Sequence, residues 1–287
     1  MNAINECVKS VRATMVAAFA LAAGVACGGP AYAEPAPAWP SHVNALYRIH
    51  FNGFDVGTFE FTSTVAGPSY TLTGDARISA LLGAFSWKGQ TRASGMIAAD
   101  GPRPAGYTFN FTGTGKTGSI KMGYTAETIT NVAHVPPHVP LPGTIAVRES
   151  HLKSVLDPLS AVMALSRTSS ANPCGRKLSI FDGKQRFDLL LSFKRQEHVS
   201  ETRPSGQPGV AFVCRVRYLP IAGHRMNEET RQLAASEGIE VSLRPVPSAG
   251  IFIPHQITIP TGAGPATLTA MRVQIVTQRN EQIALGH

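Results

Sequence analysis

The sequence contains little cysteine, and its four thiols lie far apart. Two of them, Cys7 and Cys27, fall within the first 33 residues, and the other two are Cys174 and Cys214. No C-x-x-C spacing is present, which argues against thiol–disulfide redox catalysis. Two distant thiols without clustered histidines do not form a zinc site either. We therefore expect neither a redox pair nor a bound metal.

Motifs that mark common enzyme classes are also absent. The sequence has no G-x-S-x-G and no H-E-x-x-H. Gly115-Lys116-Thr117 is similar to the end of a phosphate-binding loop, but Asn110 stands where that loop needs a glycine. His134 and His138 are four residues apart, yet the prolines between them forbid the helix on which this spacing would serve a metal. We expect no catalytic residue, cofactor or metal.

Long hydrophobic runs are lacking after the N-terminal region, so no later segment is expected to cross a membrane as a helix. Residues 1–33 are typical of a secretory signal peptide, with a basic start, an uncharged apolar stretch and an Ala31-Tyr32-Ala33 cleavage site. We expect cleavage near Ala33 and export to an oxidising compartment, most simply a bacterial periplasm. The alternative is a lipoprotein anchored through Cys27.

Removal of residues 1–33 from the 287-residue chain leaves 254 residues, a length that suits one large β domain or two small ones. The formal net charge falls only from +8 to +7, because the signal peptide holds two bases and one acid. Residues 34–41 are rich in proline and alanine, which predicts a disordered linker. Residues 42–287 are expected to form a single β-rich domain, or two subportions joined near the proline-rich segment 134–142.

Apolar and polar residues alternate with a period of two along much of the mature chain. The strongest set is Phe187, Leu189, Leu191 and Phe193. Such alternation predicts strands with one buried and one solvated face, hence antiparallel sheet. Asn-Gly and Asp-Gly pairs between strand patterns are typical of tight hairpins. We predict an all-β fold, an antiparallel open or closed barrel (half-barrel-like) with one or two short helices.

Two segments read as helices. Residues 157–167 begin with Asp157 as N-cap and Pro158 at the first helical position, and they are apolar around much of the helix circumference. We expect this helix to be buried against the sheet or to plug an open barrel. The side chains assigned to this helix plug are Leu159, Val162, Met163 and Leu165. Residues 227–237 are polar and predict a surface helix.

Cys174 and Cys214 each lie beside a predicted strand, and in an oxidising compartment we expect them to form a disulfide. Closing a loop of about 40 residues would stabilise the fold by about 4 kcal/mol in the chain-entropy model.

Basic residues recur on the polar faces of the predicted strands that flank this disulfide. The expected basic patch comprises Lys177, Lys184, Arg186, Arg215 and Arg217. One interpretation is an ordinary solvated sheet face. The other is attraction to anionic envelope material such as lipid headgroups. Nucleic acid is not an expected partner in this compartment.

Several motifs are familiar in combination. They are the segments 156–161 (LDPLSA) and 181–188 (FDGKQRFD), the cysteine pair with PIAG at 220–223, and the opening hairpin at 47–57. Together they resemble the domain of unknown function 3108 family of exported Gram-negative proteins, over most of the mature chain. The resemblance implies a periplasmic, β-rich, barrel-like protein and brings no catalytic residues.

These observations favour a periplasmic, non-enzymatic protein of the cell envelope that binds or chaperones a lipid-like or protein component. Its expected partners are an anionic lipid or apolar envelope ligand, or envelope proteins. A curled sheet with an apolar inner face could hold an apolar ligand, although side chains fill the interior of most small barrels. One alternative is a structural or envelope-integrity protein that acts through a protein interface. The other is a hydrolase of envelope polymers, since catalytic groups are recognised by geometry rather than by motif.

Overall fold

The computed structural model describes residues 38–80, 85–167 and 172–286. The expected signal peptide and residues 34–37 of the expected linker therefore lie outside the described part of the chain. The end of the linker differs from the prediction, because Trp39 packs against the main hydrophobic core and Pro40 is buried. The guanidinium of Arg167 lies 4.3 Å from the centre of the Trp39 ring. A proline- and alanine-rich composition could not reveal this distant partner.

The described residues form fourteen strands and two α-helices. The strands are β1 (His42–Phe51), β2 (Phe54–Ala66), β3 (Ser69–Ala80), β4 (Phe85–Ala98), β5 (Gly101–Gly113), β6 (Lys116–Thr125), β7 (Thr128–Val135), β8 (Arg176–Phe181), β9 (Arg186–His198), β10 (Val210–Ala222), β11 (Glu240–Val246), β12 (Ile251–Thr261), β13 (Gly264–Val276) and β14 (Gln282–Gly286). The helices are α1 (Pro158–Leu165) and α2 (Glu228–Ala235), with short 3-10 turns at η2 (Glu149–Leu152) and η3 (Pro247–Ala249). Neither α-helix, nor any other helix in the described ranges, is long and apolar enough to cross a lipid bilayer.

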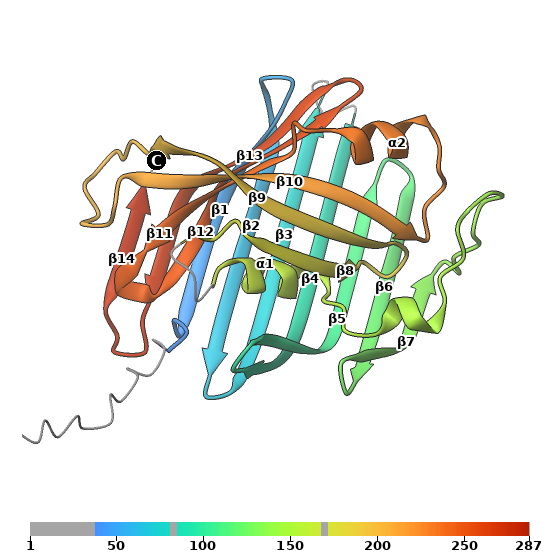
Figure 1. Cartoon of the computed structure of the whole chain (residues 1–287), viewed down its shortest axis with the longest axis horizontal. Coiled ribbons are helices and arrows are strands. Elements are labelled where there is room, and N and C mark those ends of the chain that lie inside the picture. The colour runs from blue at the N-terminus through green and yellow to red at the C-terminus, as the bar shows by residue number, and fades with distance from the viewer. Residues whose placement is uncertain (1–37, 81–84, 168–171, 287) are drawn as a thin grey trace, which may run out of the picture. The chain divides into compact units, whose positions relative to one another are not determined.

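The strands belong to a single antiparallel sheet. Its order is β7-β6-β5-β4-β3-β2-β1-β13-β12-β11-β10-β9-β8, and β14 pairs with β13 off this path. Strands β7 and β8 are the two ends of this path and do not pair with each other, so the sheet does not close. Figure 1 shows β8–β10 crossing in front of β3–β6, with α1 near the crossing. The predicted antiparallel, half-barrel-like fold with two helices is confirmed, in its open form.

Strands β1 and β13 join the two halves of the chain. They pair from His42–Val276 to Phe51–Ala266. The described residues all belong to one compact unit. The proline-rich segment 134–142 therefore connects two halves of one sheet rather than two separate bodies.

Local chemistry accounts for the hairpins. Asn52 and Gly53, between β1 and β2, have φ values of 49° and 85°. Positive φ at both central residues defines the type I′ turn, whose twist matches that of the flanking strands. In β1, Val43, Ala45 and Tyr47 are buried and alternate with more exposed neighbours, so one face of the strand points into the interior.

Helix α1 lies between two hydrophobic clusters. Leu159 and Met163 belong to a cluster built mainly on β1–β7 together with β12–β14. Ala161, Ala164 and Leu165 belong to a second cluster built on β8–β11. A helix that is apolar on all sides is stable only when it is enclosed. The folded-over sheet provides this enclosure for α1.

Candidate functional site

Helix α1 is held by a buried cap. Asp157 Oδ1 accepts hydrogen bonds from the backbone N–H groups of Leu159 and Ser160, both at 3.0 Å. Pro158 occupies the first helical position, where no N–H is required. The predicted helix start is thus the observed one.

The same carboxylate anchors the helix to the opposite wall. Ser160 Oγ donates to Asp157 Oδ2 at 2.6 Å, and Ser160 Oγ lies 2.8 Å from the hydroxyl of Tyr70 on β3. Burial raises the pKa of Asp157 to about 6, although the hydrogen bonds from Ser160 and Leu159 oppose this rise. Asp157 and Ser160 are both fully buried, so these polar groups are placed to seat α1 rather than to meet a substrate.

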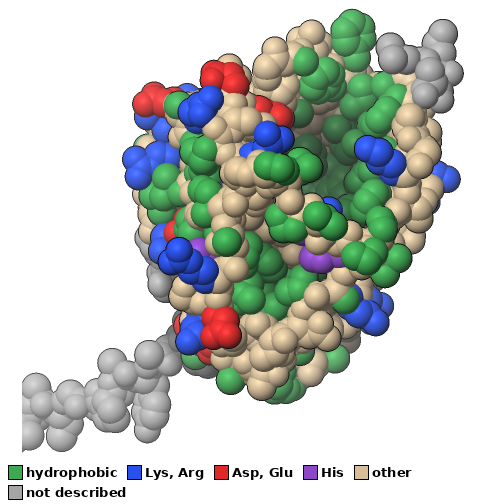
Figure 2. All heavy atoms as spheres, turned by 90° about the vertical axis from the view of Figure 1, so that its right-hand side faces the viewer, with side chains coloured by type: hydrophobic (Ala, Val, Ile, Leu, Met, Phe, Trp, Pro, Cys, Tyr) green, Lys and Arg blue, Asp and Glu red, His purple; other side chains and the backbone are tan. Residues whose placement is uncertain are grey.

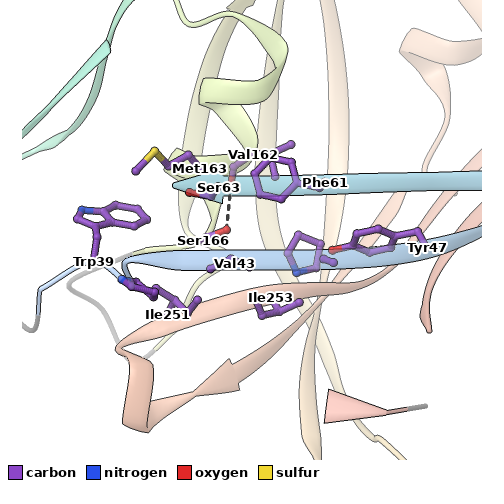
Figure 3. Close-up of a pocket in the computed structure, with 13 residues that line it drawn as sticks. Trp39, Val43, Tyr47, Phe61, Ser63, Val162, Met163, Ser166, Ile251 and Ile253 are labelled. Atoms are coloured by element: carbon purple, nitrogen blue, oxygen red, sulfur yellow. Dashed lines mark hydrogen bonds between the residues drawn. The ribbon is translucent and has the colours of Figure 1, made fainter. Parts of the chain in front are cut away.

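One end of the interior is filled. Side chains from β1, β2, α1 and β12 converge there, including Val43, Phe61, Met163 and Ile253, and Trp39 packs beside them (Figure 3). The space left between them has a volume of about 30 Å³, little more than room for one water molecule. This end of the fold is therefore an ordinary packed core.

The interior beside the second half of the sheet is open instead. A hollow of about 380 Å³, which we call the apolar groove, lies between α1 and the inner faces of β8–β12. Helix α1 contributes Pro158, Ala161, Val162 and Leu165 to it. Apart from Tyr218 and Glu240, the groove is lined by aliphatic side chains and one phenylalanine. Figure 2 shows a hollow lined by hydrophobic side chains that opens at the right-hand side of Figure 1.

Aromatic rings extend the apolar inner face on the first half of the sheet. Phe109 and Phe111 follow the buried Tyr107 along one face of β5, and their ring centres are 5.6 Å apart. Glycines on neighbouring strands let such rings lie flat. A Cβ at Gly118 would come within 2.7 Å of the Phe111 ring. Because flat rings cover the sheet without projecting far from it, they line the concave face rather than fill it.

The residues of the expected helix plug occupy different parts of this arrangement. Leu159 and Met163 are buried against the first core cluster. Leu165 and Val162 line the apolar groove, and Val162 is only partly buried. Helix α1 therefore forms one wall of the groove and leaves space beside it.

The predicted disulfide is confirmed. Cys174 and Cys214 are bonded with an S–S distance of 2.00 Å and a Cα–Cα distance of 5.2 Å, and both residues are fully buried. The bond ties the segment just before β8 to strand β10. Strands β8 and β10 are separated in the sheet by β9. The bond therefore holds together strands whose side chains line the apolar groove.

The expected basic patch is not a continuous cationic surface, which corrects the prediction. Arg186 is buried, and its Nη1 lies 2.6 Å from Asp188 Oδ1, while Lys177 Nζ lies 3.4 Å from Asp188 Oδ2. Burial works against the charge on Asp188, but the hydrogen bonds from Arg186 and Ser179 outweigh it and keep the pKa of Asp188 below its usual value. Asp188 thus neutralises part of the patch. Because residues two apart on a strand share a face, this partner of Arg186 was visible in the sequence.

The other patch residues are dispersed. Arg215 Nη1 lies 3.4 Å from Glu237 Oε2, and Arg217 is exposed. Lys184 lies away from them, in the turn between β8 and β9, where it lines a different hollow.

The sequence did not point to several of the residues that line the groove. Ile257 and Ile259 of β12 line it, as does Leu233 of α2. The predicted helix at 227–237 is present as α2, but it also covers part of the groove. A single leucine in a polar helix was the only signal for this role.

No cluster of three or more His, Cys, Asp or Glu side chains arranged to bind a metal occurs in the described ranges. The rings of His134 and His138 have centres 5.2 Å apart, and His134 Nε2 lies 2.9 Å from the carbonyl oxygen of Gly183. Since a carbonyl only accepts hydrogen bonds, this nitrogen carries a proton and is not free to bind a metal.

Comparison with known proteins gives a family and nothing beyond it. The family described as "Protein of unknown function (DUF3108)" matches residues 46–270. The chain matches no curated protein and no solved structure. The matched region runs from within β1 to within β13, and it contains α1, the disulfide and the whole lining of the apolar groove. The chain belongs to the DUF3108 family of proteins of unknown function.

Proposed function

We propose that this protein is a non-enzymatic carrier of the cell envelope that binds a lipid-like ligand in the apolar groove. The observation that carries the proposal is a hollow of about 380 Å³ with almost wholly apolar walls, whereas the packed end of the interior leaves only about 30 Å³. Protein interiors normally leave few voids larger than a water molecule. Small-molecule sites typically span about 300–1,000 Å³.

The energetics favour an alkyl chain as the occupant. Each methylene group moved from water into an apolar site contributes about 0.8 kcal/mol. A chain of several methylenes therefore gains enough free energy to offset the loss of its own mobility. The groove offers few polar partners, so selectivity for a polar headgroup must come from its ends.

The proposal also places the protein in the bacterial periplasm. The predicted signal peptide at residues 1–33 and the disulfide both support export to an oxidising compartment. Transport between membranes through an aqueous compartment requires that the alkyl part of a lipid be shielded from water. An open half-barrel with an apolar concave face provides such a shield.

Neighbouring residues of β9 give a matched test. Leu189 lines the groove, whereas Leu190 lies on the opposite face and pairs with Lys177 and Arg217. Leu189→Trp should fill the groove and reduce binding of the neutral fluorophore phenylnaphthylamine at least tenfold, since the added ring displaces the ligand. Leu190→Trp should leave binding unchanged. Equal affinities for the two variants would contradict the proposal.

Mass spectrometry of protein purified from the periplasm is the complementary measurement. A native spectrum with an adduct that disappears after organic extraction, and a lipid recovered in the extract, would support a carrier. A bare mass together with no binding of phenylnaphthylamine would refute it.

A second candidate function rests on a separate observation. Val135 is the last residue of β7, Val139 and Leu141 lie in the segment that follows, and the three are 66%, 79% and 60% exposed. Exposed apolar clusters of this kind often mark protein interfaces, which favours an envelope protein that acts through a partner. Photo-crosslinking in cells from position 139 should then give one discrete protein adduct, and none from the exposed control position Lys116. The same adducts from both positions would contradict an interface.

A further inference from the structure

A second hollow, which we call the polar pocket, adjoins the apolar groove. Its volume is about 400 Å³, and Tyr218 and Leu233 line both hollows. The remaining walls come from the β8–β9 turn, the chain after β10, the start of α2 and the segment 138–144. An elongated ligand in the groove therefore meets the polar pocket at this shared boundary.

Tyr218 separates apolar from polar surroundings. Its ring packs against Phe187, which lines the groove, with ring centres 5.3 Å apart. Its hydroxyl lies 3.1 Å from Nδ1 of His224, which lines the polar pocket. His224 Nε2 in turn lies 3.2 Å from the carbonyl oxygen of Arg186, so it carries the ring proton, and burial lowers the pKa of His224. The imidazole is thus a neutral, fully engaged part of the wall.

The polar pocket has an excess of positive charge. Lys184 and Arg225 line it, and within the described part of the chain neither side chain has a carboxylate within 4.0 Å. Glu229 is the acidic residue of the lining. Asp182 lies nearby, but its Oδ1 accepts hydrogen bonds from the backbone N–H groups of Lys184 and Gln185, at 2.8 and 2.7 Å.

The backbone brings the segments that carry Lys184 and Arg225 together. Gly223 has a φ of +78°, and a Cβ there would collide with the carbonyl oxygen of Lys184. The chain that leads to Arg225 can therefore pass directly against the β8–β9 turn only because residue 223 is a glycine. The hydrogen bonds to Asp182 fix the other side of this approach.

We infer that the ligand is an amphiphile with one anionic headgroup, whose alkyl chain lies in the apolar groove and whose headgroup lies at Lys184 and Arg225. The inference rests on the proposed function and specifies its substrate class. An anionic head supplies the partner that the two cations lack, and charge-assisted hydrogen bonds to Lys and Arg favour carboxylate or phosphate. The boundary residue Tyr218 presents an apolar ring to the chain and keeps its own hydroxyl occupied.

Competition against phenylnaphthylamine tests this assignment with three probes: laurate, dodecanol and acetate. Laurate and dodecanol share their alkyl chain and differ in charge, and acetate has the charge without the chain. In the intact mature protein, laurate should bind about tenfold more tightly than dodecanol, because it gains charge-assisted hydrogen bonds. Lys184→Gln combined with Arg225→Gln should remove this preference and leave dodecanol unchanged.

Two further double variants serve as controls. Lys177→Gln combined with Arg217→Gln removes the same charge from the outer face and should keep the preference for laurate. Lys184→Arg combined with Arg225→Lys keeps the charge at the polar pocket and should retain most of it. Circular dichroism of each variant shows whether it is folded.

The outcomes separate the two levels of the proposal. If wild-type protein binds neither laurate nor dodecanol, the proposed carrier function itself fails. If both bind and the Lys184→Gln, Arg225→Gln protein still prefers laurate, only the headgroup assignment is overturned. Acetate that competes as well as laurate would show a simple anion site and would also overturn it.

Discussion

The buried carboxyl group of Asp157 makes the stability of this protein depend on pH in a predictable direction. Burial raises the pKa of Asp157 from 3.8 to about 6 in the folded state. The folded protein therefore binds the Asp157 proton more tightly than the unfolded chain does. Between pH 4 and pH 6 this group makes the free energy of unfolding fall as the pH rises.

The size of this effect follows from the shift in pKa. Each pKa unit corresponds to 1.36 kcal/mol, so the change from 3.8 to about 6 costs the folded state about 3 kcal/mol above pH 6. The cost disappears below pH 4, where the carboxyl group is protonated in both states. Because Asp157 is fully buried, solvent screening does not reduce this value much.

Asp157→Asn removes the charge and keeps the cap. The amide oxygen would still accept from the N–H groups of Leu159 and Ser160, and the amide NH₂ would donate to Ser160 Oγ. Relative to wild type, this variant should gain almost nothing in the free energy of unfolding near pH 4 and about 3 kcal/mol above pH 6. Urea denaturation at a series of pH values, with the disulfide intact, measures this difference.

Asp157→Ala serves as the control. It also lacks the charge, but it loses the N-cap and should be less stable than Asp157→Asn at every pH, by about 1–2 kcal/mol. If the difference between wild type and Asp157→Asn stays constant from pH 4 to pH 7, Asp157 is not desolvated beneath α1. The inference that a buried Asp157 carboxylate holds the N-terminus of α1 would then be wrong.

Two other predictions concern the wall of the apolar groove and the face behind it. Replacing Cys174 and Cys214 by serine should lower the free energy of unfolding by about 4 kcal/mol, since the bond spans 40 residues of chain. Chemical denaturation of the oxidised wild type and of the variant measures this loss. A loss below about 1 kcal/mol would contradict the prediction. Arg186→Ala should cost about 3–5 kcal/mol because it leaves the buried Asp188 without its close partner, whereas Arg217→Ala on the exposed face should change stability by less than about 0.5 kcal/mol. Thermal and urea unfolding of the pair test the difference, and similar losses for both arginines would show that the Arg186–Asp188 pair is not an important buried contact.

Much of the fold could be predicted because its signals are local. Alternation along β1 and β9 fixes which side chains share a face, and Asn52-Gly53 specifies its own turn geometry. Asp157-Pro158 marks the start of α1 through contacts within one helical turn. The failures arose where a distant partner decides the outcome. Trp39 is packed because Arg167 and the core lie beside it, and Arg186 is buried in an ion pair rather than exposed.

The candidate site was predictable only in outline. A concave apolar face follows from alternation in a curled sheet, and Leu189 and Leu191 were identified on it. Which parts of that face are filled and which are left open depends on the packing of α1 against both halves of the sheet. The role of Leu233 and the juxtaposition of Lys184 with Arg225 depend on the path of the chain after β10. No local pattern encodes that path.

By itself, the sequence determined the antiparallel strands, the two helices, the disulfide partners and the family to which the chain belongs. These features depend on periodicity, turn chemistry and a small number of thiols, all of which act over short distances or leave a single choice. The tertiary structure alone decided that the half-barrel stays open, that one end is packed and that the apolar groove meets a cationic pocket. The physical reason is that these features arise from long-range pairing, such as that of β1 with β13, and from the volumes left between elements after they pack.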